Sequence, residues 1–583
     1  MPTYILGISA LYHDSAAVLL RDGEVVAAVQ EERFSRLKHD PALPVRAARW
    51  CLARAGITIA DVAWLVFYEK PLRKFDRILS TSVATFPKSW AAFPRHMRAW
   101  LGDKLWLRGN LCEAFGVRPD RVLFCEHHLS HAASAFFPSP HRDAAILCVD
   151  GVGEWATTSL WRGRDTAIEP VAEVRFPHSL GLYYSAITAH LGFAVNEGEF
   201  KVMGMAAYGQ PRFRAEMDRL LKLDDGGFSL DLDYFAWHWH PSQAASPKLE
   251  QLLGPPRYPG TPFTPRATPE GAGEAEIAAS QRYADLAATA QQQIEEAMLH
   301  LARHAKAKVG TEALCVAGGV ALNSVANHRV AAEGPFANLW IQPAAGDAGG
   351  ALGAALWAWH SVLGNPRGPA LERADLGRDT PLDRTRELLD DLGARYEDVG
   401  DDAPERAGDD LAAGKVIGWM DGRCEWGPRA LGHRSILADP RRPETRDAVN
   451  VRVKYREPFR PFAPSVVAEH ADEYFDIPAA SREPARFMLS TGPVRESARA
   501  TLGATTHVDG TARVQVVDAG TSPRYHRVIS RFGAETGVPV VLNTSFNLKG
   551  EPVVSSPVDA MASFVRSGLD LLYIDNFRVE RPR

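Results

Sequence analysis

Cysteine is scarce in this chain of 583 residues. The six cysteines never stand in a CxxC pair. This spacing predicts neither a disulfide framework nor a zinc ribbon, and it suits a reducing compartment. The first residues carry no basic stretch followed by a long apolar run, so we expect no secretory signal. We therefore expect the protein to be cytoplasmic.

A long hydrophobic run and an excess of positive charge are also missing. The longest uncharged run, residues 348–366, is too short and too polar to cross a bilayer. Lys and Arg total 66 against 71 Asp and Glu, for a net charge of −5, whereas nucleic-acid-binding domains are usually basic. We expect neither a membrane nor a nucleic acid as partner. Hydrophobic residues make up 46% of the chain, which excludes disorder and permits a large core.

One local pattern occurs twice. Residues 5–34 and 146–176 each read as a strand, a polar turn, a second strand and a tight turn containing glycine. The Asp22-Gly23 pair is typical of a hairpin turn. We interpret these segments as two copies of one β-hairpin unit. Such a duplication resembles the actin-like (ASKHA) ATPase superfamily, in which the polar turns hold nucleotide phosphates and metal.

A stretch rich in turn-forming residues, 364–378, predicts a domain boundary. We expect one domain over 1–365 and a second over 378–583. Before the boundary, the patterns predict helices at 281–305 and 348–360 and a buried strand at 314–317. After it, they predict a helix at 403–413 and strands at 416–419 and 538–542. The expected fold class is α/β.

Two histidines and two aspartates suit a metal. His127 and His131 are four residues apart and would share one face of a helix. A zincin needs Glu after the first histidine, and His128 stands there instead. Asp150 begins the polar turn of the second hairpin, and Asp347 lies in a glycine-rich segment just before a predicted helix. Together these donors would suit iron, manganese or zinc. The alternative is a surface histidine pair with two turn-forming aspartates.

Glycines near the end of the predicted strand at 314–317 suggest an anion site. Gly318 and Gly319 would let backbone N–H groups approach a phosphate. Lys201 could supply a cation, and residues 204–209 a loop that approaches the ligand closely. Each signal could equally mark a plain turn.

Residues 421–460 carry ten cations against six acids and are interrupted by Gly and Pro. Cations on loops of an acidic protein indicate a small anionic ligand, which Arg would bind bidentately and Lys as a point charge. Residues 543–547 follow a buried strand and offer hydroxyl and amide donors. The alternative is the surface use of Arg in a GC-rich genome.

Several motifs together resemble the NodU/CmcH family of ATP-dependent O-carbamoyltransferases, in order and over nearly the whole chain. They lie at residues 12–17, 31–40, 127–136, 149–154, 318–323, 427–436, 454–464 and 543–547. The resemblance implies an actin-like ATPase domain followed by an α+β YrdC-like domain. It also implies that carbamoyl phosphate and ATP form a carbamoyl-adenylate, whose carbamoyl group passes to a hydroxyl of a small natural product, as in antibiotic biosynthesis.

The resemblance also implies roles for individual residues. A divalent metal, with iron(II) the expected ion, would lie against a nucleotide phosphate, and Mg²⁺ would accompany ATP. The carbamoyl phosphate site would contain Arg429, Lys454, Arg460, Arg513, Asn543 and Ser545. The metal ligands would be His127, His131, Asp150 and Asp347. The nucleotide site would contain Lys201, Gly204, Gly318, Gly319 and Asn323.

The hydroxyl acceptor needs a base, and His13 and Asp14 on the first polar turn are our candidates. His13 could equally contact a phosphate. Aromatic residues within 69–110, a segment with nine cations and three acids, could stack on the acceptor or form a helical cap on the core. Two other functions stay open: a protein- or tRNA-directed carbamoyltransferase, and a nucleotide-gated actin-like scaffold without catalysis.

Overall fold

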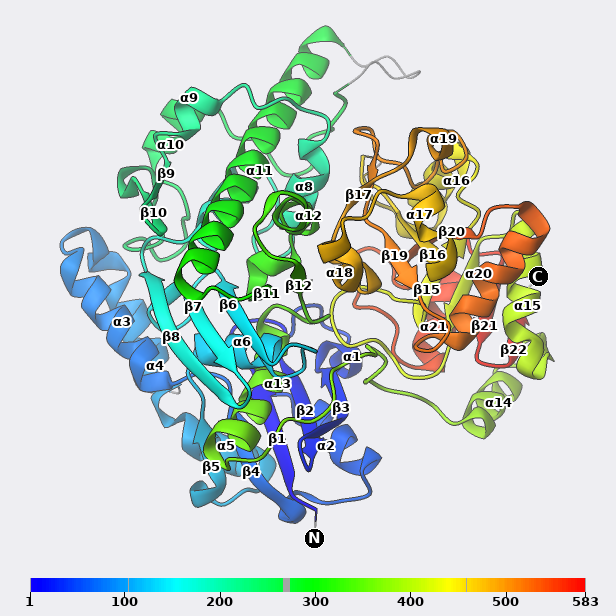
Figure 1. Cartoon of the computed structure of the whole chain (residues 1–583), viewed down its shortest axis with the longest axis horizontal. Helices are drawn as coiled ribbons and strands as arrows, with labels where there is room; N and C mark the ends of the chain where they lie inside the picture. The colour runs from blue at the N-terminus through cyan, green and yellow to red at the C-terminus, as the bar shows by residue number, and fades with distance from the viewer. Residues whose placement is uncertain (1, 103, 266–272, 458, 582–583) are drawn as a thin grey trace.

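A computed structural model of the protein describes residues 2–102, 104–265, 273–457 and 459–581. The described chain has a mixed α/β fold with three large sheets. Figure 1 shows the first sheet in blue, the second in cyan and green, and the third in yellow-green to red on the opposite side of the molecule. No helix of the described chain is long and apolar enough to cross a membrane.

The first sheet has the order β3-β2-β1-β4-β5. Its first three strands form an antiparallel meander, and β4 and β5 run parallel to β1. Every residue of β1 is buried, as expected for a central strand covered on both faces. The strands are β1 (Tyr4–Ser9), β2 (Ala16–Arg21), β3 (Glu24–Gln30), β4 (Val62–Phe67) and β5 (Val122–Phe124).

The second sheet repeats the first. Its order, β12-β11-β6-β7-β8, again has a three-stranded antiparallel meander and two strands parallel to the meander's first strand. The predicted duplication of the hairpin is therefore confirmed, and it extends to a five-stranded unit. The strands are β6 (Asp143–Val149), β7 (Ala156–Arg164), β8 (Ala167–Arg175), β11 (Ala313–Ala317) and β12 (Asn338–Trp340).

Two buried helices lie between these sheets. Helix α6 (His127–Phe136) packs on the second sheet, α13 (Asp347–Trp357) packs on the first, and the two helices pack on each other. Their close approach depends on glycine, because a Cβ atom on Gly353 would lie 1.7 Å from the carbonyl oxygen of Ser130. The same packing brings the first residue of α6 close to the first residue of α13.

This close packing makes Gly353→Ala a test of the core. We expect the substitution to lower the free energy of unfolding by about 3 kcal/mol, because the added methyl group forces the two helices apart. Denaturant unfolding measures the change. The matched control is Gly109→Ala on α5 (Leu107–Phe115), where a Cβ atom would meet nothing within 4 Å. There we expect a gain of up to about 1 kcal/mol from helix propensity. Equal effects of the two substitutions would contradict the prediction.

The other sequence-predicted elements before residue 378 are also present. The predicted helix at 281–305 lies within α11 (Glu274–Val309), and the strand at 314–317 lies within β11. The predicted helix at 348–360 corresponds to α13 and a π-helical turn that follows it. The turn-rich stretch 364–378 contains no helix or strand.

The third sheet is formed by the C-terminal part of the chain. Helices α15 (Ala403–Ala412) and α20 (Pro523–Thr536) pack together beside it, and α21 (Pro557–Arg566) packs against β14 and β21. The predicted strand at 416–419 is β14, and the one at 538–542 is β20, which begins two residues later. In sheet order the strands are β13 (Tyr396–Asp398), β22 (Phe577–Glu580), β21 (Leu571–Ile574), β14 (Ile417–Met420), β15 (Arg434–Ala438), β20 (Val540–Ser545), β16 (Ala463–Val467) and β19 (Gln515–Val517).

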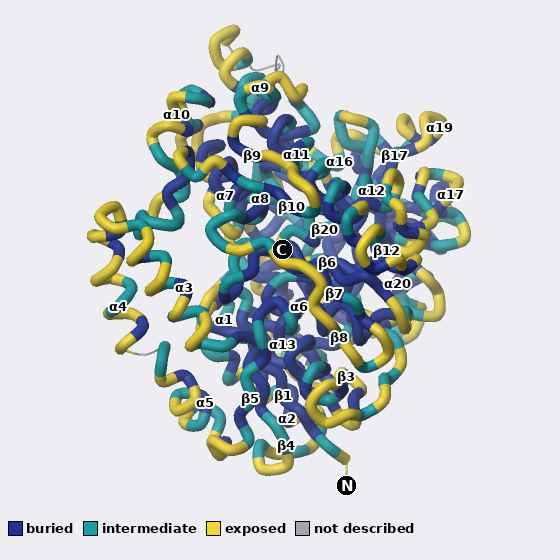
Figure 2. Tube along the Cα trace, turned by 60° about the vertical axis from the view of Figure 1, so that its left-hand side comes forward, coloured by how far each residue is buried: buried dark blue, intermediate teal, exposed yellow. Residues whose placement is uncertain are grey.

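The described residues of the segment 69–110 are mostly helical, with α3 (Pro71–Ala84) and α4 (Phe93–Gly102) on the outside of the molecule. Figure 2 shows both helices at the edge, with many exposed positions. The layer is attached to the body by Arg77, whose guanidinium donates to the carbonyl of Gly153 over 3.1 Å, and by Asp76, which accepts from Nε1 of Trp155 over 3.1 Å. The helical cap predicted for this segment is therefore present.

Candidate functional site

One cavity of about 950 Å³ lies between the duplicated sheets and the C-terminal sheet. The polar turns of both hairpins line one side of it, and the basic segment lines the other. Most of the sequence-predicted site residues line this cavity. They are His13, Asp14, Asp150, Lys201, Gly204, Gly319, Asn323, Asp347, Arg429, Lys454, Arg460, Arg513, Asn543 and Ser545. His127, His131 and Gly318 lie behind its wall.

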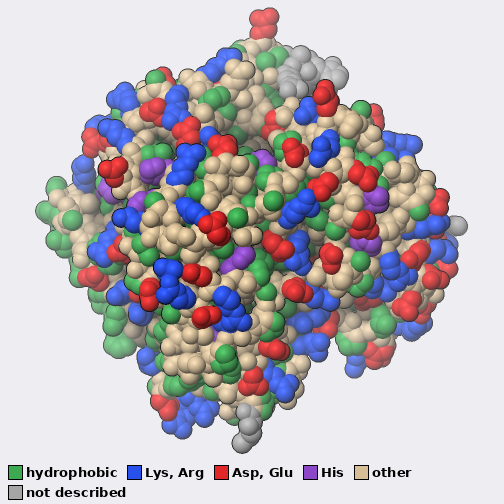
Figure 3. All heavy atoms as spheres, viewed as in Figure 1, with side chains coloured by type: hydrophobic (Ala, Val, Ile, Leu, Met, Phe, Trp, Pro, Cys, Tyr) green, Lys and Arg blue, Asp and Glu red, His purple; other side chains and the backbone are tan. Residues whose placement is uncertain are grey.

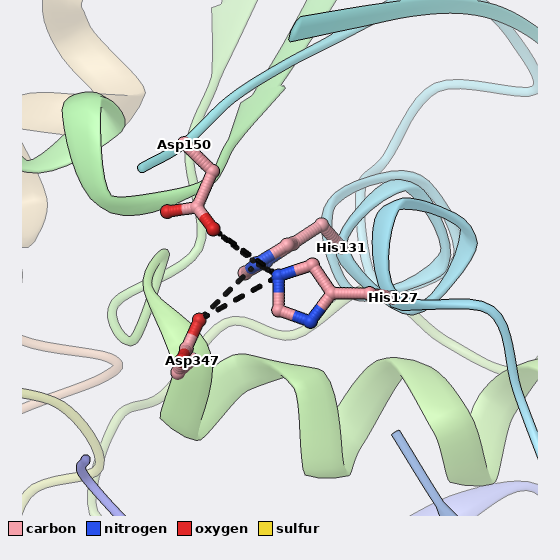
Figure 4. A group of neighbouring side chains, drawn as sticks. All are labelled: His127, His131, Asp150 and Asp347. Carbon is pink, nitrogen blue, oxygen red and sulfur yellow. Dashed lines mark hydrogen bonds and ion pairs between the residues drawn. The ribbon is translucent and has the colours of Figure 1, made fainter. Parts of the chain in front are cut away.

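The predicted metal ligands form one group (Figure 4). His127 and His131 project from the first turns of α6, Asp150 follows β6 directly, and Asp347 begins α13. The two Nε2 atoms lie 3.2 Å apart, and Nε2 of His127 lies 3.1 Å from Oδ2 of Asp150. Nε2 of His131 lies 3.5 Å from Oδ1 of Asp347. One strand end and two helix starts thus bring these side chains together.

These donors fit a divalent cation. Bonds of about 2.0–2.2 Å to one ion place neighbouring donor atoms roughly 3 Å apart, close to the separations between these atoms. Two imidazoles with two carboxylates suit a borderline ion such as zinc, manganese or iron. Burial alone would raise the pKa of Asp150, but its hydrogen bonds with the two histidines hold that pKa well below its usual range. Asp150 is thus a carboxylate and can serve as a ligand.

A chain of hydrogen bonds lies beside this group on the first polar turn. Nδ1 of His13 lies 2.9 Å from Oδ2 of Asp14, and Oδ1 of Asp14 lies 2.7 Å from Nδ1 of His39. Burial lowers the pKa of His13, but Asp347 and Asp14 outweigh it and raise that pKa to about 9. Nε2 of His13 lies 3.9 Å from Oδ2 of Asp347. The first polar turn therefore connects the four predicted metal ligands to Asp14, a half-buried carboxylate held by His39.

Sequence reasoning missed His39 as a site residue. His39 belongs to the motif at 31–40, which contributed to the family resemblance. Its place in that motif is the signal from which it could have been identified as a site residue. Its partner Asp14 has left-handed backbone, with φ of 52°. This conformation is uncommon for residues other than glycine, and short polar side chains adopt it most readily.

Five cations meet on the opposite side of the cavity. Burial lowers the pKa of each. Repulsion from neighbouring cations lowers it further for Arg429, Lys454, Arg456 and Arg513, whereas Glu457 partly offsets the effect of burial on Arg460; for Arg429 the resulting pKa is about 10. The Nε atoms of Arg429 and Arg513 are buried without a hydrogen-bond partner. Buried cations that repel one another are stabilised by an anion. The members are Arg429, Lys454, Arg456, Arg460 and Arg513, of which Arg456 was not among the residues predicted for the site.

Lys454 is fixed within this group by the strand end at β20. Its Nζ donates to the carbonyl and hydroxyl oxygens of Ser545, at 2.7 and 3.3 Å, and to the carbonyl and Oδ1 of Asn547, at 3.0 and 2.6 Å. Asn543 uses its Nδ2 group internally, donating to Ala430, Ser465 and Gln515. The amide donors predicted for Asn543 are therefore engaged in bracing the strand end, and its Oδ1 is buried without a partner.

The residues predicted for the nucleotide site have different local roles. Gly319 N donates to Oδ1 of Asp150 over 3.0 Å, and Asn323 caps α12 (Ser324–Glu333) by accepting from the N–H of Ala326. Gly318 has φ of 93°, and a Cβ atom there would lie 2.3 Å from the carbonyl oxygen of Val149. Gly318 thus permits β6 and β11 to end side by side. Nζ of Lys201 lies 3.0 Å from Oε1 of Glu457, and Gly204 lines the cavity nearby.

The fold and site together define a protein with a group of the metal-binding type and a buried cationic pocket that face one cavity. The chain belongs to the carbamoyltransferase family. The protein-family model described as "Carbamoyltransferase N-terminus" matches residues 4–356, and the family model described as "Carbamoyltransferase C-terminus" matches residues 408–581. The protein is accordingly an enzyme of the carbamoyltransferase type, as the motifs predicted.

Three relatives illustrate this membership. An uncharacterized protein of Synechocystis is 45% identical over 99% of this chain and 96% of its own length. Nodulation protein NolNO of Sinorhizobium fredii is 39% identical over 98% of this chain and 79% of its own length. The 3'-hydroxymethylcephem-O-carbamoyltransferase of Amycolatopsis lactamdurans is 37% identical over 42% of this chain and 44% of its own length.

Proposed function

We propose that the protein transfers a carbamoyl group from carbamoyl phosphate, by way of a carbamoyl-adenylate made with ATP, to a hydroxyl of a small natural product. The observation that carries this proposal is the shared cavity. One of its walls carries Asp150 and Asp347, with His127 and His131 behind them, and this set suits a metal that contacts nucleotide phosphates. The opposite wall carries five cations suited to an anion. Carbamate is a poor electrophile, and adenylation supplies a good leaving group.

The proposed reaction has three balanced steps. Water cleaves carbamoyl phosphate to carbamate and inorganic phosphate. A carbamate oxygen attacks the α-phosphorus of ATP and displaces pyrophosphate, which yields carbamoyl-adenylate. The acceptor hydroxyl then attacks the carbamoyl carbon, loses its proton and displaces AMP. Arg429, Arg460 and Arg513 would hold the phosphate charge through the first two steps. Intermediates of this kind hydrolyse readily, and a single cavity would limit their exposure to water.

We also propose a fold for each of the two domains and the residues that bind ATP and the metal. Residues 1–365 would form an actin-like ATPase domain, which the duplicated five-stranded topology supports, and residues 378–583 would form a YrdC-like domain. ATP would bind against Lys201, Gly204, Gly319 and Asn323, with Mg²⁺. The four donors His127, His131, Asp150 and Asp347 would hold a divalent ion, with iron(II) the ion that the family resemblance implies. A bound ion would supply positive charge that neutralises nucleotide phosphate oxygens.

The release of pyrophosphate tests the proposal directly. We expect purified protein to release pyrophosphate from ATP only when carbamoyl phosphate is added. Release without carbamoyl phosphate, or no release under any condition, would favour the nucleotide-gated scaffold instead. Adding a crude tRNA fraction or a protein extract in place of small hydroxyl compounds tests the macromolecular acceptors. The net charge of −5 makes the tRNA acceptor the poorer fit.

We propose that His13, braced by Asp14, is the base for the acceptor hydroxyl. It acts in its neutral form, so carbamoyl transfer should rise with pH up to the His13 pKa of about 9. We expect His13→Asn to abolish carbamoyl transfer while pyrophosphate release with carbamoyl phosphate and ATP persists within about threefold. General-base catalysis contributes about 10²–10⁴-fold, so the loss of transfer should be of that size. Chromatographic detection of the carbamoylated product and a coupled pyrophosphate assay measure the two steps. Loss of both activities would show that His13 contacts phosphate instead.

A further inference from the structure

The outer helices α3 and α4 expose large apolar side chains. In α3, Leu72, Leu79 and Val83 recur at helical spacing on one face, and Phe86 and Trp90 continue the stripe beyond the helix end. Leu72 is 71% exposed and Trp90 is 72% exposed. A surface helix normally turns such a stripe toward the core. We call the whole set the outer stripe: Leu72, Leu79, Val83, Phe86, Trp90, Phe93, Leu101 and Trp106.

The outer stripe is not the face by which these helices pack. The packing face carries Trp100, which is 5% exposed and lies 5.8 Å from the ring of Phe75, and the buried residues Arg77 and Ser82. Figure 3 shows apolar side chains gathered along the left edge of the molecule, where Figure 1 draws α3 and α4. A contiguous exposed apolar patch on a folded protein marks an interaction surface.

Unpaired cations flank the outer stripe. Residues 69–110 contain nine cations and three acids, although the whole chain is acidic. In the part of the chain that the structure describes, no acidic side chain forms an ion pair with Lys88, Arg95 or Arg98, and all three are exposed. The partner of this surface therefore carries negative charge. A second copy of this chain would bring two cationic surfaces together and is disfavoured.

We propose that α3, α4 and the turn between them dock the protein on an anionic lipid surface. Exposed Trp, Phe and Leu beside Lys and Arg is the composition by which amphipathic helices bind the headgroup region of bilayers. Phe86, Trp90 and Trp106 would enter the interface, while the cations contact headgroup phosphates. Docking of this kind needs no membrane-spanning helix, and it revises the expectation from composition that membranes play no part.

Vesicle co-sedimentation tests this proposal with the full-length protein. We expect the protein to sediment with phosphatidylcholine vesicles containing 30% phosphatidylglycerol, and to bind pure phosphatidylcholine vesicles far more weakly. The Phe86→Ser/Trp90→Ser variant should lose binding. The Lys88→Gln/Arg95→Gln/Arg98→Gln variant should bind about 100-fold more weakly, because each cation near an anionic bilayer contributes roughly fivefold. Binding of the unmodified protein should fall as salt is raised.

The matched control is Tyr258→Ser, which removes a side chain that is 73% exposed but belongs to another segment, whose backbone lies beside Gly192. We expect this variant to bind the anionic vesicles as the unmodified protein does. Failure of the unmodified protein to bind anionic vesicles, or equal binding by all variants, would overturn the proposal. Sedimentation velocity tests whether a second copy of this chain binds the outer stripe instead. A dimer that the Phe86→Ser/Trp90→Ser variant no longer forms would assign the outer stripe to that second copy and overturn the proposal.

Discussion

Replacing Lys454 by Met is expected to lower the rate of pyrophosphate release from ATP and carbamoyl phosphate by about 10²–10³-fold. Lys454 is buried and lies beside four half-buried arginines. Fixed positive charge there would stabilise the charge that develops on phosphate, and removing one such group typically costs this much. Met retains the length of the side chain, so the buried volume is filled. Steady-state rates with saturating ATP measure the effect.

The same variant should also lose the linkage between anion binding and protons. Burial and the charges of Arg456 and Arg460 hold the pKa of Lys454 well below its usual range. A bound phosphate would favour the charged ammonium and raise that pKa, so binding should take up protons wherever Lys454 is partly neutral. Calorimetric titration with inorganic phosphate in two buffers of different ionisation enthalpy measures this uptake. In Lys454→Met, the difference between the buffers should disappear.

Arg446→Gln is the matched control for Lys454→Met. Arg446 belongs to the same basic segment but lies on α16 (Pro443–Ala448), where it pairs with Asp447 at 3.2 Å and does not line the cavity. Pyrophosphate release by this variant should stay within about twofold of the unmodified protein. If the two variants were equally impaired, the basic segment would act through its overall charge, and a specific anion pocket would be the wrong interpretation.

The elements that could be predicted are those whose buried and exposed residues follow a simple pattern over a few neighbouring positions. The strand–turn–strand units at 5–34 and 146–176 were identified because a central strand is apolar along its length and a tight turn needs residues such as Asp22-Gly23. The i,i+4 spacing of His127 and His131 predicted that they would share one face of a helix, and both lie on α6. The exposure of the outer stripe could not be predicted, because an apolar helical stripe in a sequence does not indicate whether another element covers it.

The arrangement of the site depended on contacts between distant segments. Asp14 and His39 meet across 25 positions, and Lys201 meets Glu457 across 256. Spacing along the chain says nothing about such pairs. The predicted donors of Asn543 illustrate the same limit: the residue type was compatible with ligand binding, but the neighbouring strands β16 and β19 occupy its amide group with Ser465 and Gln515.

Replacing His131 by Gln is expected to weaken the binding of a divalent ion by at least about 100-fold. His131 is fully buried. Its Nε2 atom lies close to Nε2 of His127 and to the carboxylate oxygens of Asp150 and Asp347. Losing even an outer group that supports a metal ligand costs 10–100-fold, so losing a ligand should cost no less. Titration with Co²⁺, followed by its visible absorbance, measures both affinity and the ligand environment.

The chain supplies its own control on the same helix. His128 is as deeply buried as His131, but its Nδ1 lies 2.6 Å from Oγ of Ser159, away from the four donors. His128→Gln should therefore bind Co²⁺ with unchanged affinity and spectrum, even if it lowers the free energy of unfolding. The metal-bound unmodified protein should also resist unfolding by about 2.7 kcal/mol more when the ion is present at 100 times its Kd. His131→Gln should show no such gain. Loss of Co²⁺ binding in His128→Gln, with binding retained in His131→Gln, would refute the assignment, because only the side chain that faces the aspartates can act as the ligand.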